Sequence, residues 1–306
     1  MEVQGRNRLP YLASAASAVI FGFSFLFTKT ALDNLDMFQL LGSRFLVAAL
    51  FMFVLKTLRL IEIRITPAKV KSLLLVAVFQ PVLYFIFETV GVDLTSASES
   101  GVLIALIPVA VAVLASLILK ERLSPFQWLS ILASVAGVIL ITIPNFQGSS
   151  GRLAGILALL GAVVAGALYQ IFSRKASSQA SDPSAPVEVT YTMMWVGAAF
   201  FNTLGIAKYA LTGSLASYLK AFTSAETVTA ILYLGLLSSV AAFFCMNYAL
   251  SHLTASRSAV FINLTPVVSV LAGVLFRGEH FAPIQILGAA IVLLGVWGVG
   301  QTSGGH

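Results

Sequence analysis

Ten apolar segments, each about as long as a membrane-spanning helix, dominate this sequence of 306 residues. Crossing the hydrocarbon core takes about 20 apolar residues per helix. Because lipid offers the backbone no hydrogen-bond partner, such segments are helices or the strands of a closed barrel. Barrel strands are short and alternate in polarity, so we predict an all-α integral membrane protein with about ten transmembrane helices. The segments are Pro10–Lys29, Met37–Leu55, Lys71–Val90, Ser96–Leu119, Pro125–Ile143, Leu153–Phe172, Val187–Leu211, Thr227–Leu250, Ser256–Phe276 and Pro283–Val299.

The composition excludes most other classes of protein. Hydrophobic residues make up 58% of the chain and charged residues only 10%, whereas a soluble domain carries roughly 25% charged residues. This excludes a soluble globular enzyme and a disordered chain. The single cysteine, Cys245, permits no internal disulfide and no cysteine-ligated metal site. In such a protein we attribute the net charge of +6 to loop asymmetry rather than to a nucleic-acid partner.

Basic residues divide unequally between alternate loops. About 12 of them lie on one side of the predicted spans and about 5 on the other, and the richer side is expected to be cytoplasmic. Both termini then lie in the cytoplasm. The small residues of the stretch Ala13–Ala16 precede the apolar core of the first segment, so we expect a retained first helix rather than a cleaved signal peptide.

The chain contains an internal repeat. When Ala97–Val138 is placed on Ala255–Val296 without a gap, about 15 of 42 positions are identical. Apolar helices match by composition, but shared Pro, Glu and Gln at one offset are hard to obtain by chance. We therefore predict two five-helix repeats, residues 1–146 and 151–306. The telling pairs are Ser98/Ser256, Ser100/Ser258, Pro108/Pro266, Glu121/Glu279, Pro125/Pro283, Gln127/Gln285 and Gly137/Gly295.

An odd number of helices in each repeat has a physical consequence. The second repeat must enter the membrane from the opposite side, so the two repeats lie antiparallel about a pseudo-two-fold axis in the membrane plane, as in many secondary transporters. Two near-equivalent halves can exchange conformations, which opens a central site first to one side and then to the other. The alternative is a duplicated bundle with no transport role.

Several stretches of the chain carry a resemblance to a known family. They are Leu94–Ser98, Pro108 and Lys120–Gln127 in the first repeat, Leu253–Ser256, Pro266, Gly278-Glu279 and Gln285 in the second, and Arg44–Leu50 in the second helix. These stretches resemble the EamA-type domains of the drug/metabolite transporter superfamily. The resemblance implies a ten-helix carrier of small metabolites, often an exporter, in a bacterial inner membrane, and several members of the superfamily move amino acids. The family often has Trp before the glycine of the first helix, where this chain has Phe21-Gly22.

A polar stripe marks the third segment. Polar side chains inside a span are costly and are expected to face the interior of the bundle. Gln80, Tyr84 and Glu88 are spaced i, i+4 and i+8, so a regular helix places them on one face. We expect Gln80 and Tyr84 to line a substrate cavity, with interhelix hydrogen bonds as the alternative. Pro81 breaks one helical hydrogen bond beside Gln80.

Arg44 lies about two turns inside the second segment from its outer end. A lone Arg at that depth must be paired or hydrated, and Glu88 and Glu99 are candidate partners at a similar level. One interpretation is a structural ion pair on the outer side. The other makes Arg44 the anchor for a substrate carboxylate, or makes Glu88 a titrating group that couples transport to protons.

The second half offers further candidates for the cavity wall. Asn247 lies near the inner end of the eighth segment, and Asn263 lies about two turns into the ninth. Tyr169 in the sixth segment and Trp195, about two turns into the seventh, are aromatic candidates. Interhelix hydrogen bonds for the Asn residues and interfacial anchoring for the aromatic residues are the alternatives.

Two prolines occupy equivalent places in the repeats. Pro108 lies in the fourth segment and Pro266 in the ninth, and each removes a backbone donor and favours a kink. Equivalent kinks are where such a transporter bends or binds. The alternative is a static kink that packing requires.

Several other chemistries are not indicated by the sequence. The histidines make no metal-ligand spacing with Cys, Asp or Glu, and no Gly-rich phosphate loop is present, so we expect no metal, no cofactor and no ATP-driven step. The spans also lack the paired catalytic groups of an intramembrane enzyme. We therefore predict a secondary transporter that exports small organic metabolites, such as amino acids, related compounds or drugs, in exchange for protons. A passive channel, an importer, and a monomer or a homodimer remain open.

Overall fold

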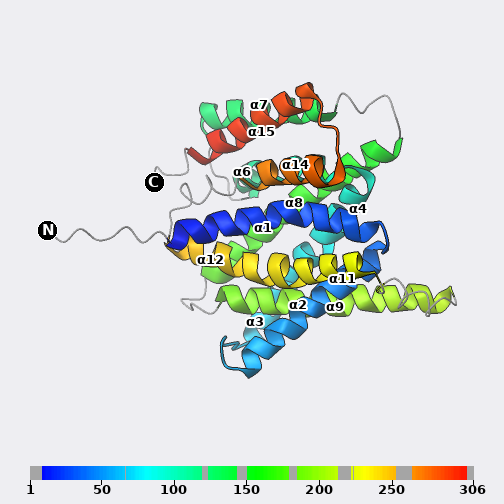
Figure 1. The fold of residues 1–306 in the computed structure, drawn as a ribbon. Helices are drawn as coiled ribbons and strands as arrows, with labels where there is room; N and C mark the ends of the chain where they lie inside the picture. Colours follow the sequence, from blue (N-terminus) through cyan, green and yellow to red (C-terminus); the bar gives the residue numbers. More distant parts are fainter. Residues whose placement is uncertain are drawn as a thin grey trace.

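The computed structural model describes residues 9–65, 67–118, 123–142, 150–178, 185–212, 222, 224–252 and 264–301. These residues form helices and turns, with no strand among them (Figure 1), which confirms the predicted all-α class. The helices are α1 (Leu9–Leu32), α2 (Met37–Thr57), α3 (Pro67–Ala77), η1 (Val78–Leu83), α4 (Tyr84–Leu94), α5 (Ala97–Ile104), α6 (Ile107–Ile118), α7 (Pro125–Thr142), α8 (Ser150–Ser178), α9 (Ala185–Leu211), α11 (Ala225–Leu232), η4 (Tyr233–Ala241), α12 (Ala242–His252), α14 (Leu264–Arg277) and α15 (Pro283–Gln301).

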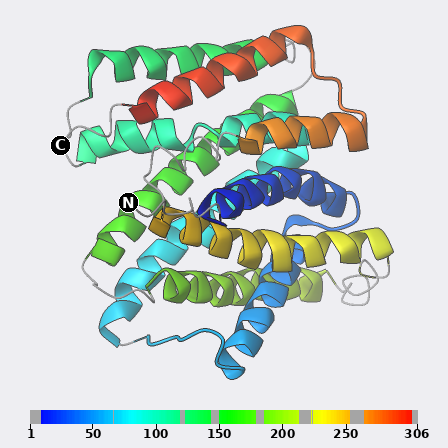
Figure 2. The same cartoon turned by 60° about the vertical axis from the view of Figure 1, so that its left-hand side comes forward.

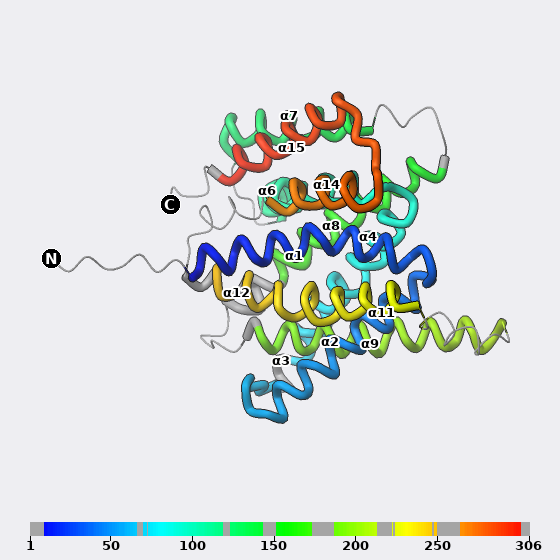
Figure 3. The backbone as a smooth tube through the Cα atoms, viewed as in Figure 1, coloured from blue at the N-terminus to red at the C-terminus, as the bar shows by residue number. Residues whose placement is uncertain are grey.

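Eight helical stretches within the described ranges are long and apolar enough to cross a membrane. They match the predicted segments one to six, eight and ten. The 27-residue α9 and the 14-residue α14 lie where the seventh and ninth segments are predicted. The helices lie side by side, and α1 begins and α15 ends at the same end of the bundle (Figures 1 and 3). The prediction of an about ten-helix membrane protein is therefore confirmed.

The distribution of side chains suits a lipid environment. Large apolar residues on the outside of the bundle are widely exposed, for example Leu129, Leu132 and Leu157, whereas Ser134 and Ser238 are buried. Lipid solvates apolar side chains, so a membrane protein gains little by burying them, and polar groups move to the interior. This inverted pattern is the one that the apolar composition predicts.

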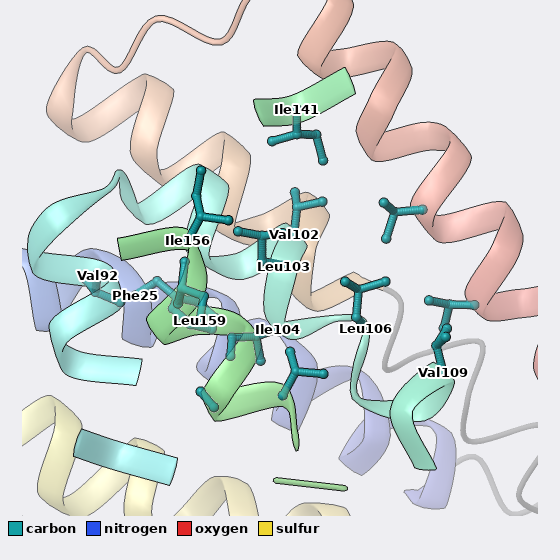
Figure 4. Close-up of a cluster of buried hydrophobic side chains, with 14 of the residues drawn as sticks. Phe25, Val92, Val102, Leu103, Ile104, Leu106, Val109, Ile141, Ile156 and Leu159 are labelled. Atoms are coloured by element: carbon teal, nitrogen blue, oxygen red, sulfur yellow. The ribbon is translucent and has the colours of Figure 1, made fainter. Parts of the chain in front are cut away.

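Two buried clusters hold the helices together. The first joins α1 and α4–α8 with α15 and includes Phe25, Leu103 and Leu159 (Figure 4). The second joins α2, α3, α4, α9 and η4. At its centre the ring of Phe45 lies 5.0 Å from that of Phe85 and 5.7 Å from that of Phe201. The candidate functional residues lie in and beside this second cluster.

Helices from the two halves of the sequence pack against each other throughout the bundle. α2 packs along α9, α5 against α14, and α7 along α15. α1 packs against α12 and α14, and α8 packs in a corresponding way against α4 and α6. Figure 2 shows α7 and α15, in green and red, paired along one side of the molecule. Each half therefore completes its packing only with the other.

The α7–α15 pair makes equivalent bonds from equivalent residues of the repeat. Gln127 Nε2 donates to the carbonyl of Val299 at 3.3 Å, and Gln285 Nε2 donates to that of Ile141 at 3.1 Å. Each Gln also accepts a hydrogen bond, at 2.9 Å in both cases, from the backbone three residues before it. Since the start of each helix meets the end of the other, α7 and α15 run antiparallel and are related locally by a two-fold axis.

The third and eighth spans each contain a wide, π-helical segment, η1 and η4. In η1 the backbone of Gln80 is non-helical, with φ −146° and ψ 115°, because Pro81 cannot donate to the helical ladder. The expectation that Gln80 shares a regular helical face with Tyr84 and Glu88 is therefore wrong. Tyr84 and Glu88 do share one face, since both lie in α4.

The two predicted kink prolines lie near helix starts. The fourth span is interrupted between Ile104, which ends α5, and Ile107, which begins α6, so Pro108 is the second residue of α6. Pro266 is the third residue of α14 and is buried. Pro is tolerated in the first turn of a helix, where its missing N–H needs no partner.

Candidate functional site

Arg44 is buried among neutral partners. It is 3% exposed, and its Nε donates to Ser239 Oγ at 2.9 Å while Nη2 donates to Ser238 Oγ at 3.2 Å. The guanidinium also lies over the ring of Phe85, 4.5 Å from its centroid, a cation–π contact. Within the described residues Nη1 makes no hydrogen bond and no carboxylate contacts the guanidinium. The positive charge is therefore oriented but not neutralised by a direct ion pair.

Glu88 is an acidic residue in the same region as Arg44. It lies one turn beyond Tyr84 on α4, is 3% exposed, and its Oε2 is buried without a hydrogen-bond partner among the described residues. The charges of Arg44 and Glu88 act on each other, although the two side chains make no ion pair. A buried carboxylate oxygen without a partner is costly, which marks Glu88 as a candidate for binding a proton or a ligand.

Small residues allow α2 to bring Arg44 to the serines. A Cβ on Gly235 in η4 would lie 2.7 Å from Val47 Cγ1 and 3.1 Å from the carbonyl oxygen of Arg44. Only glycine permits this approach between α2 and η4. The wide turn of η4 then directs Ser238 and Ser239 to the guanidinium. π-Helical turns of this kind are frequent at functional sites.

Three further candidate residues from the sequence lie in helices that belong to or border the second cluster. Tyr84 is half-buried, packs edge-on against Phe85 at 4.9 Å between ring centroids, and borders both buried clusters. Tyr169 packs against the second cluster from α8. Gln80 is buried in η1. Of these three, Tyr84 packs directly against Phe85, the ring that lies over the Arg44 guanidinium.

Glu99 lies in a different network from Arg44. Its Oε1 accepts hydrogen bonds from Arg152 Nη2 at 2.6 Å and from Gln285 Nε2 at 2.9 Å. Glu99 is 2% exposed, whereas the side chain of Arg152 is 35% exposed. The network joins α5, α8 and α15 at the end of the bundle where α1 ends and α2 begins, which we call the ion-pair end.

Two charged residues cap helices at the ion-pair end. Lys29 Nζ donates to the carbonyls of Val92, Asp93 and Thr95 at 2.5–2.9 Å, so it caps the end of α4. Glu279, which precedes α15, accepts hydrogen bonds at 2.5–2.9 Å from the amides of Ala97 and Ser98 and from the Ser98 hydroxyl, so it caps the start of α5. An anion at a helix N-terminus is stabilised by the helix dipole.

Two more ion pairs join helices of the two halves at this end. Arg277 binds Asp33 with two hydrogen bonds of 2.9 and 3.2 Å, and Lys208 binds Asp36 at 3.1 Å. Burial by itself raises the pKa of Asp36, but hydrogen bonds from the Tyr209 hydroxyl, from backbone amides and from Lys208 outweigh it and hold the pKa below its ordinary value. Asp36 is therefore ionised at neutral pH and keeps its pair.

The remaining candidate residues from the sequence lie apart from Arg44 and Glu88 or outside the described residues. Trp195 is 37% exposed and packs against the exposed Phe53, with 6.5 Å between ring centroids, and against Tyr191. Asn247 lies in α12, but its side chain is outside the described part of the structure, and Asn263 lies outside the described residues. The structure thus brings together Arg44, Glu88 and Tyr84.

Sequence reasoning missed the partners of Arg44. Ser238 and Ser239 are two adjacent hydroxyl residues in an apolar span, which is the signal that could have identified them. The repeat includes Glu279 and Ser98, but the repeat pattern does not indicate that the two side chains are in contact. The partners lie far away in the sequence, 195 residues for the Arg44–Ser239 bond, so no local pattern specifies them.

Comparison with known proteins identifies the family. The pattern of the EamA-like transporter family matches residues 8–143 and 153–301. The uncharacterised transporter YcxC of Bacillus subtilis is 32% identical over 94% of this chain and 91% of its own length. A probable terminal-alkyne amino-acid exporter of Streptantibioticus cattleyicolor is 26% identical over 65% of this chain and 63% of its own length. A solved crystal structure shares the fold, with a TM-score of 0.64, 17% identity and coverage of 95% of this chain and 97% of its own. The chain is therefore a multi-pass membrane transporter that belongs to the EamA-like transporter family.

Proposed function

We propose that this protein is a secondary transporter that exports small organic metabolites, such as amino acids, related compounds or drugs, by alternating access to a site at Arg44 and Glu88. The observation that carries the proposal is the pair of buried, opposite charges: Arg44 lies against the wide turn η4, and Glu88 lies in α4, which continues from the wide turn η1. An intramembrane charge is costly and marks a pathway or a binding site. Arg44 anchors an anionic group of the substrate, and Glu88 exchanges protons.

Alternating access requires two repeats of opposite direction. The proposed repeats are residues 1–146 and 151–306. The antiparallel α7–α15 pair, with Gln127 and Gln285 in matching roles, supports them, as does the correspondence between the contacts of α1 and those of α8. In a carrier of this type one repeat rocks against the other around the shared site.

The proposed location is the bacterial inner membrane, with both termini in the cytoplasm. The excess of basic residues on the loops at that side supports this orientation. The ion-pair end then faces outward, where Glu99–Arg152, Asp33–Arg277 and Asp36–Lys208 hold the helices together. We infer that this conformation is closed to the outside.

The proposed function is tested by a growth screen and a flux assay. A strain that overproduces the protein is grown with toxic amino acids, nucleosides and cations, and resistance to one class identifies the cargo and the outward direction. Counterflow of the labelled cargo in proteoliposomes then separates a carrier from a channel, because only a carrier shows saturation and counterflow. Hypersensitivity instead of resistance indicates an importer. Absence of both flux and resistance rejects the transport proposal.

Replacing Glu88 with Gln is expected to remove the pH dependence of transport. The amide keeps the size of the side chain but cannot bind or release a proton, so an imposed proton gradient should no longer drive uptake into proteoliposomes. Counterflow, which needs no net proton movement, should be affected less. Within the described part of the chain, the charged or titratable groups that act on Glu88 are Arg44 and Tyr84. A wild-type pH profile in Glu88→Gln would exclude it as the coupling group, and the exposed Glu62→Gln is the matched control.

Breaking the Glu99–Arg152 pair is expected to open the outer side. This hydrogen-bonded pair, in which Glu99 is buried and Arg152 is partly exposed, holds only the closed state. Arg152→Gln should therefore shift the equilibrium by about tenfold, the effect of about 1.4 kcal/mol. The shift is measured in a protein that carries Ser239→Cys and Cys245→Ser. The readout is the extent to which an impermeant thiol reagent, added outside, labels the new thiol. Arg64→Gln, which breaks the exposed Glu62–Arg64 pair, is the control. Equal labelling with and without the Glu99–Arg152 pair would contradict an outer closure.

A further inference from the structure

The chain leaves α2 through a turn with an unusual backbone conformation. The N–H of Leu60 donates to the carbonyl of Leu55 at 2.9 Å, and the N–H of Arg59 donates to that of Lys56 at 3.0 Å. These two bonds form a Schellman motif, in which the position of Arg59 is left-handed and is usually occupied by glycine. Arg59 has a φ of 58° and is the only non-glycine residue with a positive φ in the described part of the chain. This conformation is unfavourable for a residue that carries a Cβ.

Contacts within the chain do not explain why an arginine occupies this position. The exposed Arg59 side chain makes no hydrogen bond and no ion pair with any residue that the structure describes. Lys56, one turn earlier, is also exposed, and its Nζ lies 5.4 Å from the ring centroid of Tyr191 on α9. Arg64 in the same turn differs, because it pairs with Glu62 at 2.9 Å. A strained residue that the fold itself does not use points to a role outside the fold.

Exposed apolar side chains surround these two basic residues. Leu58 and Leu60, directly before and after Arg59, are widely exposed, as are Phe53 and Val54 on the preceding turns of α2. The turn lies at the edge of the bundle, at the end opposite to the ion-pair end (Figures 1 and 2). In a protein that spans a membrane, such apolar side chains enter the acyl region while a neighbouring basic group stays at the level of the headgroups.

We propose that the end of α2 binds the headgroup phosphate of an anionic phospholipid through Arg59 and Lys56, with Leu58 and Leu60 among the acyl chains. Charge complementarity favours this occupant, because both basic side chains lack an acidic partner among the described residues and a guanidinium matches phosphate with two parallel donors. A zwitterionic phospholipid offers the same phosphate without the net charge and binds more weakly. The inference is independent of the cargo and of the direction of transport.

The test uses Trp195 as a reporter in the full-length protein in lipid nanodiscs. Trp195 on α9 packs against Phe53 of α2, with 6.5 Å between ring centroids, whereas the other two tryptophans, Trp128 and Trp297, lie on α7 and α15. In the Trp128→Phe/Trp297→Phe protein, quenching by brominated phosphatidylglycerol is compared with quenching by brominated phosphatidylcholine. We expect the anionic lipid to be preferred at Trp195 by about fivefold or more, since each basic side chain at an anionic surface contributes an effect of about this size.

The variant Arg59→Gly separates lipid binding from a structural role. Glycine adopts the left-handed conformation freely, so the melting temperature in phosphatidylcholine should equal or exceed that of the wild type. The preference for phosphatidylglycerol at Trp195 should nevertheless fall by about fivefold. Arg59→Lys keeps the charge and should retain most of the preference. The Glu62→Gln/Arg64→Gln protein loses the neighbouring ion pair without a change in net charge and should behave like the wild type.

A second reporter shows whether the effect is local. In the Trp195→Phe/Trp297→Phe protein, Trp128 reports from α7, on the other side of the bundle from the end of α2 (Figure 1), and Arg59→Gly should leave its quenching unchanged. An equal change at Trp128 and Trp195 would indicate a general effect of charge and overturn the site. Equal quenching of Trp195 by the two lipids, or a preference that survives Arg59→Gly, would also overturn it. A lowered melting temperature of Arg59→Gly in phosphatidylcholine, with the preference intact, would assign Arg59 to the dipole of α2 instead.

Discussion

Transport by the Arg44→Gln variant is expected to fall by about 100-fold or more at substrate concentrations below saturation. The guanidinium is a buried positive charge beside the second cluster, and it is already oriented by Ser238 and Ser239. Losing one partner of a buried charge pair costs about 2–5 kcal/mol, which corresponds to a large loss of affinity. The measurement is initial counterflow in proteoliposomes against substrate concentration.

The same variant separates a binding role from a structural one. A glutamine still hydrogen-bonds to the serines, and it removes a buried charge that is costly to desolvate, so the protein should remain folded in detergent. Thermal unfolding of Arg44→Gln should therefore differ little from the wild type. Wild-type counterflow, or unfolding of the variant without its substrate, would contradict the role of Arg44 as an anchor. Arg64→Gln again controls for loss of a positive charge.

Gly295→Leu is expected to prevent stable assembly of the bundle. A Cβ on Gly295 would lie 2.6 Å from the backbone oxygen of Ser130 on α7, and a backbone atom cannot move aside as a flexible side chain can. Forcing α7 and α15 apart costs about 3 kcal/mol or more, and it also breaks the bonds of Gln127 and Gln285. We expect little monodisperse protein after extraction and a strongly lowered melting temperature.

The chain supplies controls for this prediction on the same pair of helices. Gly300, also on α15, has open space where a Cβ would stand, so Gly300→Leu should be tolerated. Gly137 is the repeat counterpart of Gly295, and its Cβ would lie 2.6 Å from the carbonyl oxygen of Gly288. Gly137→Leu should therefore be as damaging as Gly295→Leu. Equal stability of the Gly295 and Gly300 variants would refute the close antiparallel contact.

The amino-acid sequence predicts the class of the fold because hydropathy acts locally. Each span is a run of apolar residues whose length is set by the bilayer, so α1, α2 and α7 agree with their predicted segments within a few residues. The Gln and Gly residues of the repeat were identified from one constant offset. Their equivalent bonds in α7 and α15 follow from equivalent positions in two similar repeats of one chain.

Local helix geometry was only partly predictable. The spacing of Gln80, Tyr84 and Glu88 predicts a common face only if the helix is regular, and η1 interrupts it at Gln80. Pro81 is a visible cause, but the size of its effect depends on how neighbouring helices accommodate the freed backbone groups. The wide turn η4 contains no proline, and no sequence signal indicated it.

Hydropathy and the cost of intramembrane charge are enough to predict that this chain spans a membrane as related apolar helices and that Arg44 and Glu88 face the interior. The partners of the buried charges follow from the packing of the helices: Ser238 and Ser239 bind Arg44, and Arg152 rather than Arg44 binds Glu99. The physical reason is that hydropathy and helical period fix the face that a residue occupies, whereas its partners depend on the packing of helices that small residues such as Gly235 allow to approach.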